Sequence, residues 1–180
     1  MSNISIVIGS WGSYNECNKR ALGSEWLDLE DFDTYEEIEE ELTKQGFELD
    51  GIDEELFIQD IEGISANSCN WDYTHPKDLF ELLSEADVIS NDYNYEIMSA
   101  FLEVSTWEDF KSRVDSYGSS WCDDIYLYKN QDWYDLGYNL MHESYEIPDY
   151  LDNYIDYQRY GEDLKYDGYE EYNEGIIEIR

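Results

Sequence analysis

Residues 34–46 read Thr-Tyr-Glu-Glu-Ile-Glu-Glu-Glu-Leu-Thr-Lys-Gln-Gly, and this stretch predicts the first helix of the fold. Thr34 and Glu37 have the spacing of a capping box, in which each side chain bonds the backbone N–H of the other residue. Gly46 supplies a natural C-terminal stop. The apolar positions repeat at i, i+3 and i+7 and therefore share one face of the helix: Tyr35, Ile38 and Leu42.

Segments typical of β-strands flank this helix and predict a three-stranded sheet. They are short and rich in apolar residues: Ile4–Ile8, Glu25–Leu29 and Glu55–Ile61. Between the first two strands, the glycine- and serine-containing residues Gly9–Asn15 indicate a loop. We therefore expect an N-terminal module, residues 1–62, made of a three-stranded sheet and one helix.

The middle of the chain has a helical pattern. Residues 62–73 are rich in Gly, Ser and Asn and are interpreted as a linker. Three helices are expected after it, at Pro76–Ala86, Tyr93–Val104 and Trp107–Tyr117, the last capped by Ser105-Thr106 and ended by Gly118. The second of these has an apolar stripe: Tyr93, Ile97, Ala100 and Phe101. Residues 63–118 are thus expected to form a central helical module.

The last third of the chain mixes both patterns. We expect a strand at Asp124–Tyr128, a helix at Asp132–His142 and a closing strand at Gly175–Ile179. Pro148 is expected to open a further helical run with an apolar stripe: Leu151, Tyr154 and Ile155. Residues 119–180 would form a mixed α/β C-terminal module. The predicted fold class is α+β, as an elongated chain of three small modules.

The charge of the chain restricts its partners. Its 180 residues include 45 Asp plus Glu against 10 Lys plus Arg, a formal net charge of −35. Such a surface repels nucleic-acid phosphates and anionic membranes, so neither is an expected partner. The 18 Tyr, 6 Trp and 6 Phe exclude a disordered acidic chain. At the charge density of B-DNA, one charge per ~1.7 Å, 35 charges correspond to roughly 60 Å of duplex, or about 17–18 base pairs.

No catalytic or cofactor site is predicted. Asp163–Glu174 matches part of a calcium-binding loop, but Lys165 occupies a ligand position, and a turn closed by Gly168 is the simpler interpretation. His75 and His142 lie at expected helix ends and are more simply structural. Three widely spaced cysteines give neither a disulfide framework nor a zinc motif. With no apolar stretch long enough for a signal peptide or a membrane span, we expect a soluble cytoplasmic protein without enzymatic activity, cofactor or metal.

Ordered motifs along nearly the whole chain resemble the ArdA antirestriction family. These motifs are Ile4–Ile8, Gly12–Asn15, Gly23–Leu29, Phe57–Gly63, Leu79–Glu85, Ala100–Glu103, Ile147–Tyr157, Asp163–Leu164 and Gly168–Tyr169. The resemblance implies an elongated, bent homodimer that mimics B-form DNA and occupies the DNA-binding groove of type I restriction–modification enzymes. It also implies an origin in phages or other mobile elements, and a dimer contact in the C-terminal module, for which Tyr154 and Ile155 are the candidates.

Carboxylates are accordingly the candidate partner-binding groups, standing in for phosphates. They are Asp28, Asp31, Asp33, Glu36, Glu37, Glu40, Glu81, Glu85, Asp87, Asp92, Glu96, Glu103, Asp109, Asp115, Asp123 and Asp124. Three alternatives remain open: a mimic directed at another DNA-binding defence or nucleoid protein, a calcium- or cation-binding acidic protein, and a chaperone for basic proteins.

Overall fold

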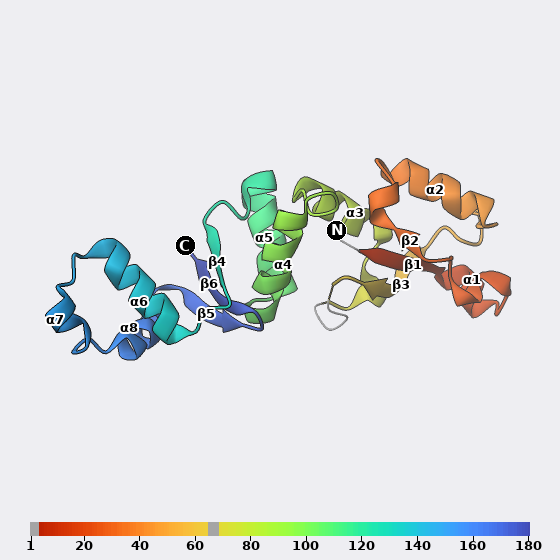
Figure 1. The fold of residues 1–180 in the computed structure, drawn as a ribbon. Coiled ribbons are helices and arrows are strands. Elements are labelled where there is room, and N and C mark those ends of the chain that lie inside the picture. Colours follow the sequence, from red (N-terminus) through yellow and green to blue (C-terminus); the bar gives the residue numbers. More distant parts are fainter. Residues whose placement is uncertain (1–3, 65–68) are drawn as a thin grey trace. The chain divides into compact units, whose positions relative to one another are not determined.

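The computed structural model describes residues 4–64 and 69–180, and the chain divides into two compact units. Unit 1 comprises residues up to Leu102 together with Thr106–Trp121, and unit 2 comprises Glu103–Ser105 and Cys122–Arg180. The described residues form eight α-helices and two three-stranded antiparallel sheets, which confirms the α+β class (Figure 1). The division into three modules stays a prediction.

The sheet of unit 1 has the order β2-β1-β3, with β1 (Ser5–Ser10) between β2 (Leu27–Asp28) and β3 (Leu56–Glu62). All three predicted strands are therefore present. Ile6 pairs with Leu27 on one side and Ile61 on the other, and a bulge interrupts the β1–β3 register after Val7. The central strand is almost entirely buried, as its continuous apolar run requires.

The predicted loop Gly9–Asn15 is wrong, because Trp11–Asn15 forms the helix α1. Ser10 accepts a hydrogen bond from the N–H of Ser13 at 3.3 Å and so caps this helix. Trp11 stacks on Phe57 of β3, with ring centroids 4.2 Å apart. The helix depends on this contact between residues far apart in sequence, which local patterns do not encode.

Helix α2 (Tyr35–Lys44) begins and ends as its sequence predicts, and its three expected apolar residues are buried. Past its end, Gly46 has φ of +91°, a left-handed conformation that favours glycine. Short 3₁₀ turns, Lys19–Leu22 and Leu29–Asp31, complete the connections between β1 and α2.

Helices α3 (Pro76–Glu85), α4 (Asp92–Val104) and α5 (Trp107–Tyr117) follow, close to their predicted bounds. A 3₁₀ turn, Gly118–Ser120, ends α5. The indole of Trp121, which is fully buried, packs edge-on against Phe110 and donates to the carbonyl of Ala86 at 2.9 Å. The stripe predicted on α4 is wrong at Tyr93, which is 61% exposed.

Part of the predicted linker, residues 65–68, lies outside the described residues. After these residues, the 3₁₀ turn Trp71–Tyr73 inserts Trp71 into the core, where it packs edge-on against Trp107 at 5.1 Å. The part of this segment that is described is therefore anchored.

Unit 2 contains the sheet β4-β6-β5, with β4 (Ile125–Lys129), β5 (Tyr169–Tyr172) and β6 (Gly175–Ile179). Strand β5 is absent from the prediction, because Tyr-Glu-Glu-Tyr shows no alternation of apolar and polar residues. The buried core of the unit gathers residues from α6 (Trp133–Ser144), the 3₁₀ turn Leu164–Asp167 and the sheet: Trp133, Leu136, Leu164, Tyr169 and Ile176.

The helix predicted to run on from Pro148 is wrong. The chain forms two short helices instead, α7 (Asp149–Asp152) and α8 (Tyr157–Asp163), and Tyr154 lies in the turn between them with 86% of its surface exposed. Helix α8 packs directly on α6 at two glycines. A Cβ atom at Gly161 would lie 1.8 Å from the carbonyl oxygen of Trp133, and one at Gly137 would lie 2.2 Å from that of Tyr157. Only residues without a side chain permit this crossing.

Candidate functional site

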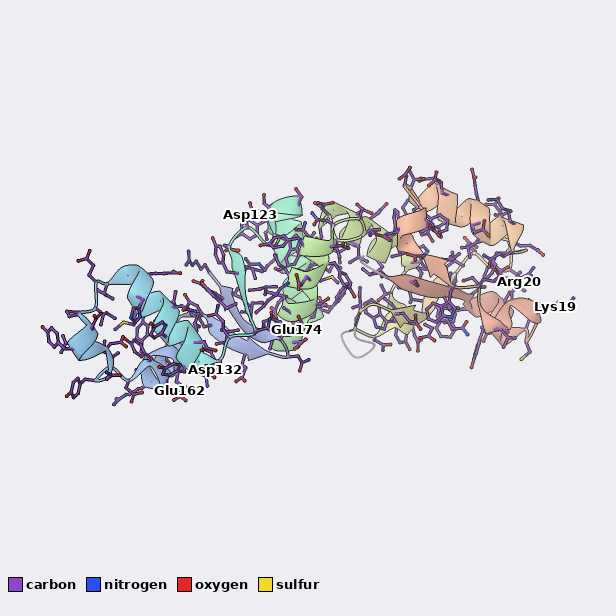
Figure 2. All side chains as sticks on the ribbon, viewed as in Figure 1. Lys19, Arg20, Asp123, Asp132, Glu162 and Glu174 are labelled. Atoms are coloured by element: carbon purple, nitrogen blue, oxygen red, sulfur yellow. The ribbon has the colours of Figure 1, made fainter. Side chains whose placement is uncertain are left out.

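The structure places all sixteen candidate carboxylates at the surface. Half-buried are Asp28, Glu96 and Asp124. Exposed are Asp31, Asp33, Glu36, Glu37, Glu40, Glu81, Glu85, Asp87, Asp92, Glu103, Asp109, Asp115 and Asp123. Figure 2 shows side chains covering both units, with Asp123 among those labelled.

Helix α2 and the loop that follows it line an open acidic groove of about 980 Å³. The predicted Glu36 and Glu40 lie on this groove. Three further carboxylates also line it, Glu39 from the helix and Glu48 and Asp50 from the loop. Sequence reasoning omitted the loop residues because the fold, and not the helical spacing, brings them beside α2.

Two candidate carboxylates also hold the starts of helices. Glu37 accepts the backbone N–H of Asp33 at 2.7 Å and that of Thr34 at 3.3 Å. In the same way, Asp109 accepts the backbone N–H of Thr106 at 3.3 Å at the start of α5. A carboxylate in the first turn also interacts favourably with the helix dipole. These charges therefore stabilise the fold while remaining exposed.

Two candidate carboxylates, one on α3 and one just after it, have local partners of their own. The carboxylate of Glu81 lies 3.6 Å from the ammonium of Lys77, one helical turn away on α3. Asp87, which has φ of +51°, accepts from the amide of Asn91 at 2.8 Å. Exposed ion pairs of this kind contribute little to stability. A cation of a partner can therefore replace Lys77 beside Glu81 at little cost to the fold.

Unit 2 contains a second acidic groove that the sequence prediction omitted. It has a volume of about 600 Å³ and is lined by Asp132 and Asp135 at the start of α6 and by Glu171 and Glu174 at the β5–β6 turn. Asp132 and Glu174 are labelled in Figure 2. Nearly forty residues separate the two pairs in sequence, so spacing alone gives no signal for this site. The predicted Glu103 also belongs to this unit and accepts the backbone N–H of Asn173 at 2.8 Å.

Two carboxylates are buried and have structural partners. Asp53 is fully buried and accepts from the hydroxyl of Ser13, the N–H of Glu48 at 2.8 Å and the guanidinium of Arg20 at 3.0 Å. Burial acts to raise the pKa of Asp53, but these hydrogen bonds and the Arg20 charge outweigh it, so the pKa is lowered. Asp53 therefore stays ionised and ties the loop before β3 to the segment after α1.

The second buried carboxylate, Glu178 of β6, is only 3% exposed. It accepts from the hydroxyl of Tyr128 at 2.9 Å and pairs with the guanidinium of Arg180. Burial, followed by the hydrogen bond to Glu178, raises the pKa of Tyr128 well above its usual range, so this hydroxyl remains a donor. Sequence patterns identified neither Asp53 nor Glu178 as buried.

The two candidate dimer residues differ in exposure: Tyr154 is exposed and Ile155 is half-buried.

At the partial calcium motif, Asp163 ends α8, a 3₁₀ turn follows, and Gly168, with φ of +90°, leads into β5. The simpler interpretation, a turn closed by Gly168, is confirmed. Among the residues that the structure describes, no group of three or more His, Cys, Asp or Glu side chains is arranged to hold a metal ion.

Across residues 4–64 and 69–180, no helix combines the length and the apolar character that a bilayer crossing requires.

The fold and its surface define a class: a small α+β protein with ordered aromatic cores and a surface dominated by carboxylates. A family model described as "Antirestriction protein (ArdA)" matches residues 6–178. The chain therefore belongs to the ArdA family of antirestriction proteins. No curated protein matches the chain in a sequence comparison.

Proposed function

We propose that the protein inhibits type I restriction–modification enzymes by occupying their DNA-binding groove as a mimic of DNA. Family membership supplies the antirestriction role. The charge distribution supports the mimicry, because the groove of a DNA-binding enzyme presents Lys and Arg side chains that bind phosphates, and carboxylates satisfy the same donors.

The observation that carries the proposal is the even spread of acidic charge over both units. Unit 1 has 28 acidic and 6 basic side chains, a net charge of −22, and unit 2 has 17 and 4, a net charge of −13. Both values correspond to about one net negative charge per five residues. A local site for a cation or a small ligand would concentrate charge at one place, whereas a surrogate for a phosphate backbone distributes it.

Several of the few basic side chains are engaged within the chain itself. Arg20 pairs with Asp53, Lys44 with Glu41 at 3.2 Å, and Arg180 with the buried Glu178. Pairing with Asp53 and Glu178 directs two guanidinium groups toward buried acids and away from the exposed carboxylates of the candidate set. These two guanidinium groups therefore neutralise buried acids of the fold and none of the candidate carboxylates.

Binding of this kind depends on many weak contacts and on release of the counterions held by both surfaces. Its affinity therefore falls as salt rises. Neutralising one exposed carboxylate has a small effect, and neutralising six on one unit has a large one.

A competition assay tests the proposal. A purified type I methyltransferase core holds a fluorescent DNA duplex, and the protein is titrated in at two salt concentrations. We expect stoichiometric displacement of the duplex that weakens at the higher salt. Poly-glutamate at the same total charge is the matched control, and it should displace the duplex poorly because its carboxylates are not held in place by a fold. Failure of the protein to displace the duplex at micromolar concentration would overturn the proposal.

The family resemblance further leads us to propose a homodimer whose contact includes Tyr154 and Ile155. Sedimentation velocity of the wild-type protein and of Tyr154→Ser tests it. A wild-type protein that sediments as a monomer at micromolar concentration would overturn it.

A further inference from the structure

One face of α6 carries a row of aromatic rings, which we call the tyrosine ladder: Tyr134, Tyr138 and His142. These residues follow each other at i, i+4 and i+8 and so lie on the same side of the helix. Tyr134 and Tyr138 are 47% and 37% exposed. Their ring planes are within 18° of parallel, with centroids 6.4 Å apart, and the ring of His142 lies 4.0 Å beyond Tyr138.

A buried ring supports the ladder from below. Tyr157 of α8, which is 3% exposed, meets Tyr134 edge-on at 5.9 Å and Tyr138 at 5.1 Å. Its hydroxyl donates to Asp152 of α7 at 2.8 Å, and the same carboxylate oxygen lies 3.1 Å from Nε2 of His142. Contacts from α6, α7 and α8 therefore fix the orientation of these rings before any partner binds.

The charge around the ladder selects a cationic partner. Residues 132–163 contain nine acidic side chains and a single basic one, Arg159. Ring faces attract cations through their quadrupole, and neighbouring carboxylates strengthen that attraction. The same charge repels the phosphates of a nucleic acid.

The chain itself shows that its rings accept cations. The guanidinium of Arg180 lies 4.9 Å over the half-exposed ring of Tyr126, and the ammonium of Lys165 lies 4.6 Å over Trp133. The tyrosine ladder offers the same chemistry to groups outside the chain.

We infer that the tyrosine ladder is a contact site for arginine side chains of the partner protein. The carboxylates around the ladder would neutralise the other cations of that partner. The inference rests on the proposed function in that the arginines belong to a DNA-binding groove. Guanidinium is planar and weakly hydrated and stacks on aromatic faces, whereas the ammonium of lysine does neither as well. The ladder therefore discriminates between the two basic residues, which a carboxylate surface alone does not.

The first test is a binding titration that needs no restriction enzyme. Protein with ¹³C-labelled tyrosine rings is titrated with hexa-arginine and, separately, with hexa-lysine at physiological salt. We expect the Tyr134 and Tyr138 signals, assigned by single Tyr→Phe variants, to shift with hexa-arginine and much less with hexa-lysine. Equal shifts with both peptides, or no shift with either, would overturn the inference.

The second test uses the competition assay with matched variants. Tyr134→Leu/Tyr138→Leu keeps apolar bulk but removes the rings, Tyr134→Phe/Tyr138→Phe keeps the rings, and Tyr145→Leu/Tyr166→Leu removes two exposed tyrosines outside the ladder. Because each exposed cation–ring contact contributes modestly, we expect roughly tenfold weaker inhibition from the ladder leucine variant and wild-type inhibition from the other two. The rings carry no charge, so the slope of affinity against salt should stay unchanged, whereas carboxylate neutralisation should reduce it.

Outcomes of the two tests separate the inference from the proposed function. A ladder leucine variant that melts like the wild type and inhibits equally well would overturn the inference and leave DNA mimicry intact. Equal weakening by the Tyr145/Tyr166 control would also overturn it. A wild-type protein that fails to displace DNA would overturn the proposed function, and the peptide titration would still decide whether the ladder binds arginine.

Discussion

Substitution of Gly161 by alanine is expected to destabilise unit 2, against the usual preference of helices for alanine. Alanine in place of glycine within a helix is ordinarily stabilising by about 1 kcal/mol. At Gly161, however, the new Cβ would lie 1.8 Å from the carbonyl oxygen and 2.7 Å from the carbonyl carbon of Trp133. Both atoms belong to the backbone of α6, so no side-chain rotation relieves the overlap.

The two helices must therefore move apart by more than 1 Å, given a contact distance of about 3.5 Å. Overpacking of this kind costs about 1–3 kcal/mol, and the upper end applies here because the obstacle is backbone. After the gain in helix propensity, the net loss is about 1–2 kcal/mol, or roughly 5–15 °C in the melting temperature of a unit of this size. Gly137→Ala, whose Cβ would meet the carbonyl oxygen of Tyr157 at 2.2 Å, should behave in the same way.

Thermal unfolding followed by circular dichroism measures the loss, and hydrogen exchange of peptides from α6 and α8 localises it. Gly51→Ala is the matched control, because its Cβ would make only ordinary contacts, the nearest at 3.5 Å from the carbonyl of Glu48. An unchanged or higher melting temperature for Gly161→Ala would refute the reasoning and show that the helices are not in direct backbone contact.

Three further predictions concern charge and pH. The lowered pKa of Asp53 means that its contribution to stability is present above the usual carboxyl range and is lost as pH falls through the folded-state pKa. Asp53→Asn, which leaves Arg20 without its buried partner, should therefore cost about 2–4 kcal/mol in urea unfolding at pH 7 and less at acid pH, and an equal cost across this range would contradict this. Burial, with the hydrogen bond to Asp152, raises the pKa of Tyr157 to about 12, so its hydroxyl favours the folded state below pH 10 and that contribution is lost as pH rises toward 12. Tyr157→Phe should reduce the difference between the melting temperatures at pH 9 and pH 11.5, and a reduction no larger than that of Tyr166→Phe would count against it. Finally, the melting temperature of the wild type should rise from low to moderate salt as self-repulsion is screened, whereas flat behaviour would mean that bound cations already neutralise the surface.

Local signals predicted much of the fold. Helix α5 runs from Trp107 to Tyr117 as expected, because a capping threonine, an apolar repeat and a terminal glycine all agree. Helix α1 and strand β5 could not be predicted in this way. The first depends on Trp11 stacking on a strand distant in sequence, and the second is a Tyr-Glu-Glu-Tyr segment whose two ends are buried only because it pairs with β6.

The partner-binding role of the candidate carboxylates stays a prediction, but their exposure can be understood from the sequence. A charged side chain without a strong partner stays at the surface, so composition alone places residues such as Glu36 and Asp123 in solvent. Composition does not reveal that Asp53 and Glu178 are buried acids with structural roles, because their Arg partners are identified only by the fold. The groove formed by Asp132 and Glu174 depends in the same way on tertiary structure.

The helix-capping carboxylates suggest how such a surface changes during evolution. Glu37 and Asp109 are tied to their positions, because moving either by one residue would remove a helix cap. An exposed acid such as Glu40 or Asp123 has no such constraint, and its charge can pass to a neighbouring position without loss to the fold. Related proteins are therefore expected to conserve the total charge and the capping acids, while the other acids change position. Their sequence identity can then become low although the negative charge of the surface is preserved.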